Sequence, residues 1–341
     1  MSDWEAAGAF EVADGVHRIP LPLPGDALRA VNVYAISEGD GADGDGLTLV
    51  DSGWALAEAR QQLEAALGSI GHELGDVRRF LVTHVHRDHY TLALMVRRLF
   101  GSRIALGEGE RGSLGYIMGP PGRVADAHRA QLISAGARPL VDQLWSSSEP
   151  QPRDVAEWDW PDEWLDGTAD VKAGGRTLRV IPTPGHTHGH VVFVDSERRL
   201  LFAGDHVLPH ITPSIGFEPD RPELPLGDYL ASLRLVRSLP EMRLLPAHGP
   251  VSDSVHARID ELIAHHGRRF DEAADAIRRG ADTAYEAARL LTWTRRGRRF
   301  DELDPFNQML AVMETGAHLD VLVRQDRLRM TVADGVMTYS A

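Results

Sequence analysis

The fold follows from the stretch Thr83-His84-Val85-His86-Arg87-Asp88-His89-Tyr90, which places three histidines and one aspartate within six positions. The apolar run 80–82 leads into it and predicts a short buried strand. Because side chains alternate along extended backbone, His84 and His86 point the same way. The chain then turns, with Asp88 and His89 at the turn, toward an apolar segment, 92–100, that predicts a helix.

This spacing produces two neighbouring sets of metal-ligating side chains. Such an arrangement suits two adjacent metal ions better than one. Imidazole and carboxylate ligands together favour zinc, with iron or manganese as alternatives. The other interpretation is a solvated histidine-rich loop, and the buried strand directly ahead of the motif argues against it.

The pattern H-x-H-x-D-H after a strand is the signature of the metallo-β-lactamase superfamily, and the chain resembles that family in three further places. Each is a short cluster directly after an apolar run, which is where α/β architectures carry their sites. In chain order the clusters are Thr183-Pro184-Gly185-His186, Phe202-Ala203-Gly204-Asp205 and Leu244-Leu245-Pro246-Ala247-His248-Gly249. Four clusters in the family's order are far more specific than any one of them.

The resemblance implies an α/β fold, the αββα sandwich of the superfamily, over residues 1–252. It also implies seven metal ligands in two groups joined by one bridging aspartate: His84, His86 and His186 for one ion, Asp88, His89 and His248 for the other, and Asp205 between them. In two-metal sites the ions lie about 3.5–4 Å apart and share a hydroxide that acts as nucleophile. Asp88 is also expected to act as general base or proton shuttle. The aspartate of Val50-Asp51-Ser52-Gly53 is expected near the metals in a structural role.

Composition limits the classes of function. The chain has 341 residues, enough for two domains, and 36 Lys and Arg against 50 Asp and Glu give a net charge of −14. This balance argues against general affinity for nucleic acid or anionic membranes. The absence of cysteine excludes disulfides and thiolate ligands, including the zinc-ligating cysteine of lactam-hydrolysing members. With no signal peptide and no long apolar run, we expect a cytoplasmic protein.

The first part of the chain alternates predicted strands and helices. Strands are predicted at 16–23, 30–36, 47–50 and 103–106, a glycine- and aspartate-rich turn at 39–46, and helices at 56–70 and 226–239. The segment 108–176 interrupts this alternation as an insertion in the catalytic domain; it contains a Ser/Pro stretch, 146–152, and Trp158, Trp160 and Trp164. These tryptophans either line a substrate pocket or pack the insertion onto the domain.

Residues 253–341 have a different pattern, which predicts a second domain. Helices are predicted at 255–279, 283–293 with Thr283 as N-cap, and 306–323, followed by a hairpin of 327–330 and 336–339. Three helices and a hairpin are typical of a winged helix. This part also resembles the C-terminal domain of the β-lactamase-like-protein-2 branch, which includes an endoribonuclease and fungal polyketide-synthase partner thioesterases.

The charge of this second part bears on its role. It carries 13 basic and 15 acidic residues, and its one basic cluster is Arg295, Arg296, Arg298 and Arg299. Because electrostatics dominates affinity for nucleic acids, packing, dimerisation or a wall of the active site is favoured over DNA binding.

Further histidines crowd the predicted ligand loops. His190 is expected to support the ligands without binding metal, and His206 to orient Asp205 by a hydrogen bond. His188 either reaches the substrate or is an exposed loop residue, and no role is assigned to His210. Histidines outside the clusters are interpreted as surface or structural residues: His17, His72, His128 and His318.

One fold hosts many reactions, so the reaction is less well specified than the site. The leading hypothesis is a dinuclear-metal hydrolase that cleaves an ester, thioester or lactone of a small molecule. The alternatives are a metal-dependent endoribonuclease and a metal-stabilised DNA-binding regulatory module. No membrane or nucleic-acid partner is expected, and a homodimer stays open.

Overall fold

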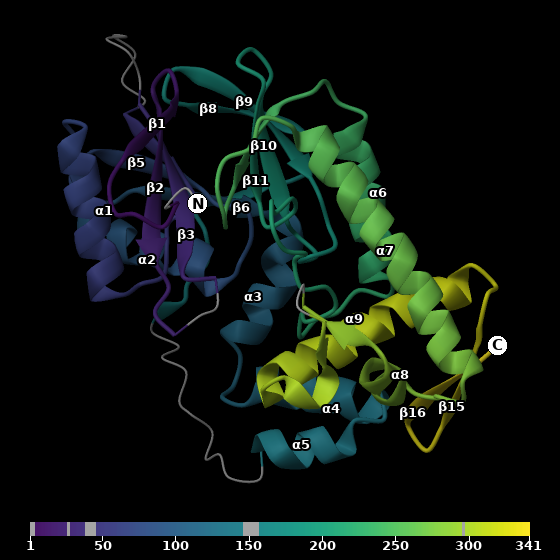
Figure 1. The fold of residues 1–341 in the computed structure, drawn as a ribbon. Coiled ribbons are helices and arrows are strands. Elements are labelled where there is room, and N and C mark those ends of the chain that lie inside the picture. The colour runs from purple at the N-terminus through teal and green to yellow at the C-terminus, as the bar shows by residue number, and fades with distance from the viewer. Residues whose placement is uncertain (1–3, 26–27, 38–45, 146–156, 295–296) are drawn as a thin grey trace.

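The structure is a computed structural model that describes residues 4–25, 28–37, 46–145, 157–294 and 297–341. The predicted Ser/Pro stretch at 146–152 lies outside these ranges, as do Arg295, Arg296 and all but the last residue of the predicted turn at 39–46. The described residues form two β-sheets packed face to face, with helices on both outer faces (Figure 1).

The first sheet has the strand order β1-β2-β3-β4-β5-β6-β7. Strands β1 to β4 pair antiparallel, and β4 to β7 pair parallel. Their bounds are β1 (Phe10–Ala13), β2 (Val16–Pro22), β3 (Ala30–Ile36), β4 (Leu47–Val50), β5 (Val77–Leu81), β6 (Arg103–Gly107) and β7 (Glu163–Leu165). The strands predicted at 16–23, 30–36, 47–50 and 103–106 are thus confirmed to within a residue, whereas the strand predicted at 80–82 begins earlier, at Val77.

The second sheet has the order β12-β11-β10-β9-β8, in which only β11 and β12 pair parallel. Its strands are β8 (Ala169–Ala173), β9 (Arg176–Pro182), β10 (Val191–Asp195), β11 (Leu200–Gly204) and β12 (Arg243–Pro246). The strands β10 and β11 are buried along their whole length, as expected for strands covered on both faces.

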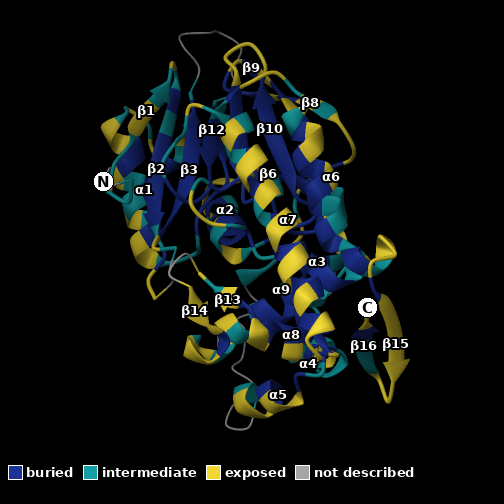
Figure 2. Cartoon of the chain, turned by 45° about the vertical axis from the view of Figure 1, so that its right-hand side comes forward, coloured by how far each residue is buried: buried dark blue, intermediate teal, exposed yellow. Residues whose placement is uncertain are grey.

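Three apolar cores hold the layers together. Tyr34, Phe193 and Phe202 belong to the core between the sheets. Helices α1 (Ala57–Ser69) and α2 (Arg87–Phe100) cover the outer face of the first sheet, and α6 (Pro225–Arg237) and α7 (Val255–Arg278) cover that of the second (Figures 1 and 2). This is the predicted αββα sandwich.

Helices make up most of the described part of the insertion that lies between β6 and β7. The insertion contains α3 (Arg111–Ile117), α4 (Arg123–Ser134), α5 (Arg138–Trp145) and strand β7. Trp158 stacks on Tyr90 of α2 with 6.1 Å between ring centroids, and Trp160 lies edge-on to Trp164 at 5.9 Å. Trp158 and Trp164 also pack against the core under the first sheet, which supports the packing interpretation for these two.

The C-terminal part has the predicted order of three helices and a hairpin. After α7 come α8 (Ala284–Leu290), α9 (Pro305–Arg324) and the strands β15 (Arg329–Ala333) and β16 (Val336–Ser340), with a small strand pair, β13 (Thr292–Trp293) and β14 (Arg298–Arg299), between the last two helices. The Thr283 side chain accepts a hydrogen bond from the Glu286 N–H and caps α8 as predicted. The core of these helices is continuous with that outside the second sheet, and the winged-helix identification stays a prediction.

Among the described residues, no helix combines the length and apolarity that a bilayer span requires.

Candidate metal centre

The predicted ligands lie at one end of the sandwich, where β5, β9, β11 and β12 end. β5 leads into His84 and His86, β9 into His186, β11 into Asp205 and β12 into His248. Helix α2 begins at Arg87, earlier than the predicted start near Leu92. His86 has extended backbone and is the N-cap residue of this helix. Asp88 and His89 therefore lie in the first turn of that helix.

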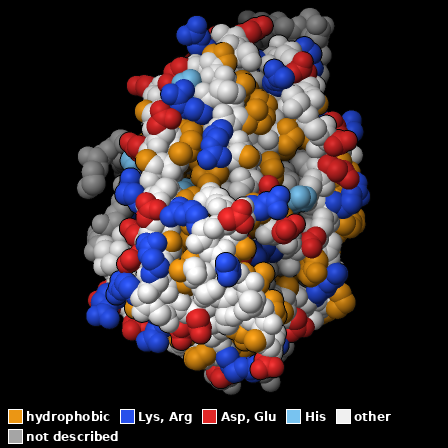
Figure 3. All heavy atoms as spheres, turned by 90° about the vertical axis from the view of Figure 1, so that its right-hand side faces the viewer, with side chains coloured by type: hydrophobic (Ala, Val, Ile, Leu, Met, Phe, Trp, Pro, Cys, Tyr) orange, Lys and Arg blue, Asp and Glu red, His pale blue; other side chains and the backbone are white. Residues whose placement is uncertain are grey.

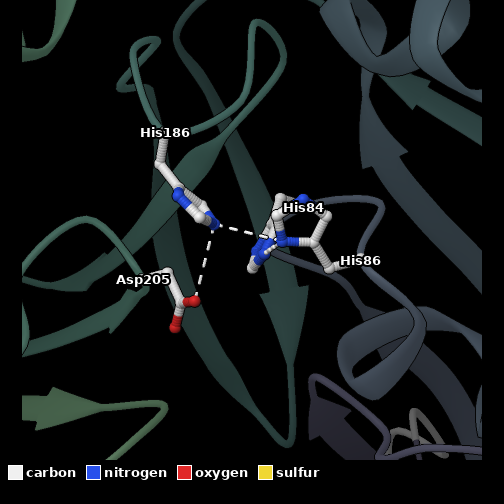
Figure 4. A group of neighbouring side chains, drawn as sticks. All are labelled: His84, His86, His186 and Asp205. Carbon is white, nitrogen blue, oxygen red and sulfur yellow. Dashed lines mark hydrogen bonds and ion pairs between the residues drawn. The ribbon is translucent and has the colours of Figure 1, made fainter. Parts of the chain in front are cut away.

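The first group consists of His84, His86, His186 and Asp205, shown in Figure 4. His86 Nδ1 lies 3.0 Å from His84 Nε2 and 3.1 Å from His186 Nε2. Asp205 Oδ2 is 3.5 Å from His186 Nε2. All four ligand atoms lie within 4.8 Å of one another. Tetrahedral zinc with bonds of about 2.0–2.1 Å separates its ligand nitrogens by about 3.3 Å, so this spacing fits a metal ion.

The second group consists of Asp88, His89 and His248. Asp88 Oδ2 is 3.5 Å from His89 Nε2 and 3.5 Å from His248 Nε2. Asp205 joins this group through its other oxygen, because Oδ1 lies 3.4 Å from His248 Nε2 and 3.8 Å from His89 Nε2. One carboxylate thus presents one oxygen to each group.

Buried atoms without partners test whether a cation fits here. Among the described residues, His89 Nε2, His248 Nε2 and Asp205 Oδ1 are buried and have no hydrogen-bond partner. Buried polar atoms normally have hydrogen-bond partners, because a buried donor or acceptor without one costs about 1–3 kcal/mol of stability. Both nitrogens lie within 3.8 Å of Asp205 Oδ1, so one cation between them would satisfy all three atoms.

Hydrogen bonds on the far side of the rings fix which nitrogen faces the centre. His186 Nδ1 lies 2.8 Å from the Ser214 carbonyl, and His248 Nδ1 lies 2.8 Å from the Ala30 carbonyl. A carbonyl can only accept, so each Nδ1 carries the proton and each Nε2 offers a lone pair. These outer partners orient both rings toward the centre.

Asp51 orients the His89 ring of the second group in the same way, through a contact at Nδ1. Its carboxylate accepts hydrogen bonds from the Thr83 N–H (2.8 Å) and hydroxyl (3.0 Å), and lies 2.9 Å from His89 Nδ1. Asp51 has a positive φ of 61°, which turns the chain sharply after β4. The resemblance predicted a structural aspartate here, and the structure places it directly behind His89.

Burial and nearby charges shift histidine pKa values in opposite directions in the first and the second group. Burial lowers the pKa of His86 to about 3 and that of His186 to about 4, so both rings are neutral at neutral pH. Burial also acts to lower the pKa of His89, but the carboxylates of Asp88, Asp51 and Asp205 outweigh it and raise this pKa to about 10. The second group therefore concentrates negative charge that favours a cation, and a metal there competes with the His89 proton.

The remaining histidines of these loops take different places. His190 accepts a hydrogen bond from the Asp205 N–H at Nε2 (3.2 Å) and bonds the Thr183 hydroxyl at Nδ1 (2.8 Å), which fits the predicted supporting role. The predicted hydrogen bond from His206 to Asp205 is absent: the His206 ring is buried instead against Tyr229, with 5.4 Å between ring centroids. His188 and His210 are exposed.

Sequence reasoning missed a buried pair of carboxyl groups behind the histidine loops. Glu110 is fully buried, accepts a hydrogen bond from the Thr187 hydroxyl, and is bonded by the Val85 N–H. Glu218 accepts from the Ser113 hydroxyl at 2.7 Å and from the His188 N–H. The pair thus holds the loop of His84 and His86 and the loop of His186 in place.

Burial raises the pKa of both carboxyl groups, and the proximity of Glu218 raises that of Glu110 further. Both groups are therefore harder to ionise than an ordinary glutamate. No motif marks Glu110 or Glu218; the only sequence signal is the run Gly107-Glu108-Gly109-Glu110, which starts at the last residue of β6 and whose glycines allow close contact with Gly189.

The sequence is similar to known proteins over much of its length. A family model described as Metallo-beta-lactamase superfamily matches residues 27–248. A beta-lactamase-like protein 2 homolog of Caenorhabditis elegans is 36% identical over 115 residues, which are 34% of this chain and 36% of that protein. The atrochrysone carboxyl ACP thioesterase of Aspergillus fumigatus is 30% identical over 274 residues, 80% of this chain and 50% of that protein. The matches thus span about a third and a half of these curated relatives.

Two solved structures resemble nearly the whole chain. A metallo-beta-lactamase family protein from Thermus thermophilus has a TM-score of 0.78 and 27% identity, covering 97% of this chain and 99% of that one. A beta-lactamase domain protein from Burkholderia ambifaria has a TM-score of 0.77 and 30% identity, covering 98% and 94%. The similarity therefore includes the C-terminal helices and hairpin.

Replacing Asp51 by Asn should weaken metal binding. The amide would present a donor to His89 Nδ1 and favour the tautomer that protonates Nε2, so affinity should fall on the order of 10–100-fold. Competition with a chelator measures this. The matched control is Asp195→Asn, which removes a buried carboxylate paired with Arg176 at 3.3 Å, away from the centre. That variant should lose stability but keep metal affinity, and equal metal loss in both would contradict the role of Asp51.

Replacing Glu218 by Gln should stabilise the fold in a pH-dependent way. Because burial raises its pKa to about 7, Glu218 keeps its proton in the folded chain over a pH range in which the unfolded chain already ionises, so stability falls as pH rises from the ordinary glutamate range toward pH 7. Glutamine keeps the acceptor and does not titrate. The melting temperature of the variant should exceed that of the wild type by a few degrees at about pH 8 and by less at about pH 5. Glu223→Gln, at an exposed site, should show no such dependence, and a pH-independent difference for Glu218→Gln would refute the assignment.

Proposed function

Because the chain belongs to the metallo-beta-lactamase superfamily, we propose that it is a metal-dependent hydrolase with a dinuclear centre. The observation that carries the proposal is the Asp205 carboxylate, which presents Oδ2 to one group of histidines and Oδ1 to the other. A single-metal site would have no use for a second group of ligand atoms at this distance.

In this proposal the ligands divide as the sequence predicted. One ion would be held by His84, His86 and His186 and the other by Asp88, His89 and His248, and Asp205 would contact both. Nitrogen and oxygen donors favour zinc, with iron or manganese as alternatives. Two such ions would supply Lewis-acid polarisation of the scissile group and would lower the pKa of a bound water toward 7.

Asp88 is the protein group proposed to move a proton. It is the most exposed carboxylate of the centre, with 18% of its side chain accessible against 10% for Asp205. Burial acts to raise the Asp88 pKa, but the neighbouring His89, His248 and His86 outweigh it and lower this pKa. The ionised carboxylate can accept a proton from an attacking water and return it to the leaving group.

An ester, thioester or lactone of a small molecule is the proposed substrate class. Support comes from the relative named as a thioesterase, which aligns with 80% of this chain, and from the net charge of −14, which disfavours polyanions. Its reaction needs one activated water and a place for one carbonyl, without an extended basic surface.

A metal-dependent endoribonuclease is the second candidate, because β14 exposes Arg298 and Arg299 and the C-terminal part has the helix and hairpin order of a winged helix. On the face shown in Figure 3, however, Lys and Arg side chains alternate with Asp and Glu side chains and form no continuous basic area. RNA binding needs several phosphate contacts. The third candidate, a DNA-binding regulatory module, is disfavoured because DNA binding does not require two complete groups of metal ligands.

Metal content and activity together test the dinuclear centre. Purified protein expressed with sufficient metal should hold two ions per chain. Asp205→Ala should reduce the content of both and lower kcat/KM by more than the roughly 10–100-fold typical of outer-shell changes. His210→Ala, at an exposed histidine of the loop after Asp205, is the matched control and should change neither. An Asp205 variant with unchanged metal content and activity would remove the basis of the proposal.

Substrate class is tested by comparing a thioester and lactone panel with single-stranded RNA at physiological salt. We expect turnover in the panel and weak RNA affinity, since the chain offers few clustered cations. Efficient, metal-dependent RNA cleavage that is lost in an Arg298→Ala/Arg299→Ala variant would instead establish the endoribonuclease.

A further inference from the structure

Among the residues that the structure describes, no strand pairs with the outer edge of β15 in the C-terminal hairpin. All five residues of β15 are exposed, including Met330 at 40% and Val332 at 62%. Figures 1 and 2 both show the hairpin at the periphery of the molecule, with β15 on its outer side. An open edge with exposed apolar side chains is a template for pairing with another strand.

The other strand of the hairpin is held by the body of the protein. Tyr339 of β16 is buried, its N–H donates to the Asp282 carbonyl at 2.7 Å, and its hydroxyl donates to Asp320 at 2.9 Å. The hairpin is thus fixed in place on its inner side, and β15 is presented as a rigid edge.

The turn of the hairpin determines which groups of β15 face outward. Asp334 and Gly335 both have positive φ, 51° and 78°, the signature of a two-residue type I′ turn, which makes Ala333 and Val336 the closing hydrogen-bonded pair. Because hydrogen-bonded and non-hydrogen-bonded pairs alternate, the backbone N–H and C=O groups of Met330 and Val332 point away from β16. They are available to a further antiparallel strand.

The sequence of β15 is complementary to itself in the antiparallel direction. With a two-fold axis at Thr331, Met330 of one copy lies opposite Val332 of the other, so the two exposed apolar side chains meet. Arg329 then lies opposite Ala333, beside the turn that carries Asp334. Neither Arg329 nor Asp334 makes an ion pair with any other residue in the described ranges, so both charges are available to the partner copy.

We propose that β15 is a dimerisation edge, at which two copies of this chain pair antiparallel about Thr331 and form a four-stranded sheet. The occupant is a second copy because apolar residues then match apolar residues and the basic end matches the acidic end. Strand pairing alone buries less than the roughly 1,200 Å² of a stable interface, so the dimer should dissociate on dilution.

A single engineered cysteine tests this register. The chain has no cysteine of its own, so Thr331→Cys introduces the only thiol. In the proposed dimer residue 331 forms a non-hydrogen-bonded pair with itself, with Cα atoms about 4.5 Å apart, within the range a disulfide spans. Under mild oxidation the variant should form a covalent dimer on a non-reducing gel. Ser340→Cys, exposed on β16, is the matched control and should stay monomeric.

A second substitution separates specific pairing from random collision. Adding Val332→Lys to Thr331→Cys places like charges across the apolar pair and should reduce cross-linking at least several-fold, and wild-type protein should show a concentration-dependent dimer in sedimentation velocity. Equal cross-linking of the Thr331 and Ser340 variants, cross-linking that Val332→Lys leaves unchanged, or a wild-type protein that is monomeric at all concentrations would each overturn the proposal.

Discussion

The carboxylate of Asp51 is the contact on which the arrangement of the centre depends most. It accepts two hydrogen bonds from Thr83 and lies against His89 Nδ1, so it fixes the end of β5 and the first turn of α2 together. The neighbouring Ser52 hydroxyl donates to the His89 carbonyl at 2.7 Å and anchors the same helix turn. A buried charge with this many donors holds its geometry firmly, because any displacement leaves a buried group without its partner.

The two sheets are joined at the centre by polar contacts across the sandwich. The Asn32 side chain of β3 donates to the Pro246 and Gly249 carbonyls, both at 2.9 Å, and the Tyr34 hydroxyl donates to the Pro246 carbonyl at 2.8 Å. These bonds hold the loop of His248 against the first sheet. On the other side the Val191 N–H donates to the Thr83 carbonyl at 2.9 Å, and Glu110 joins the loops of His84 and His186. Ligands from two sheets therefore keep a common position without relying on the apolar core alone.

Features that depend on neighbouring residues could be predicted from the sequence, whereas contacts between residues far apart in the chain could not. Apolar periodicity and local motifs are short-range, and they correctly gave the strands before each cluster, the order of the C-terminal helices and the Thr283 cap. Long-range polar contacts leave no local pattern, so Glu110 and Glu218, 108 positions apart, could not be paired by inspection. The buried histidine pair of His266 and His318, 3.1 Å apart between α7 and α9, was missed for the same reason. The start of α2 was predicted too late because its first turn is polar, and the apolar pattern begins only after it.

Glycines beside the ligands belong to the site for steric reasons. Gly204 precedes Asp205 with φ +50°, and a Cβ there would lie 2.6 Å from the Thr83 hydroxyl and 2.7 Å from His190 Nε2. Gly185 precedes His186 with φ +139°, and a Cβ there would lie 2.4 Å from the Tyr229 backbone. Contacts this short force a backbone shift, because neither the strand end nor helix α6 can give way. The glycine before each of these ligands is therefore what lets the second sheet bring Asp205 and His186 close enough to the histidines of the first, and the spacing of the centre depends on it as directly as on the ligands.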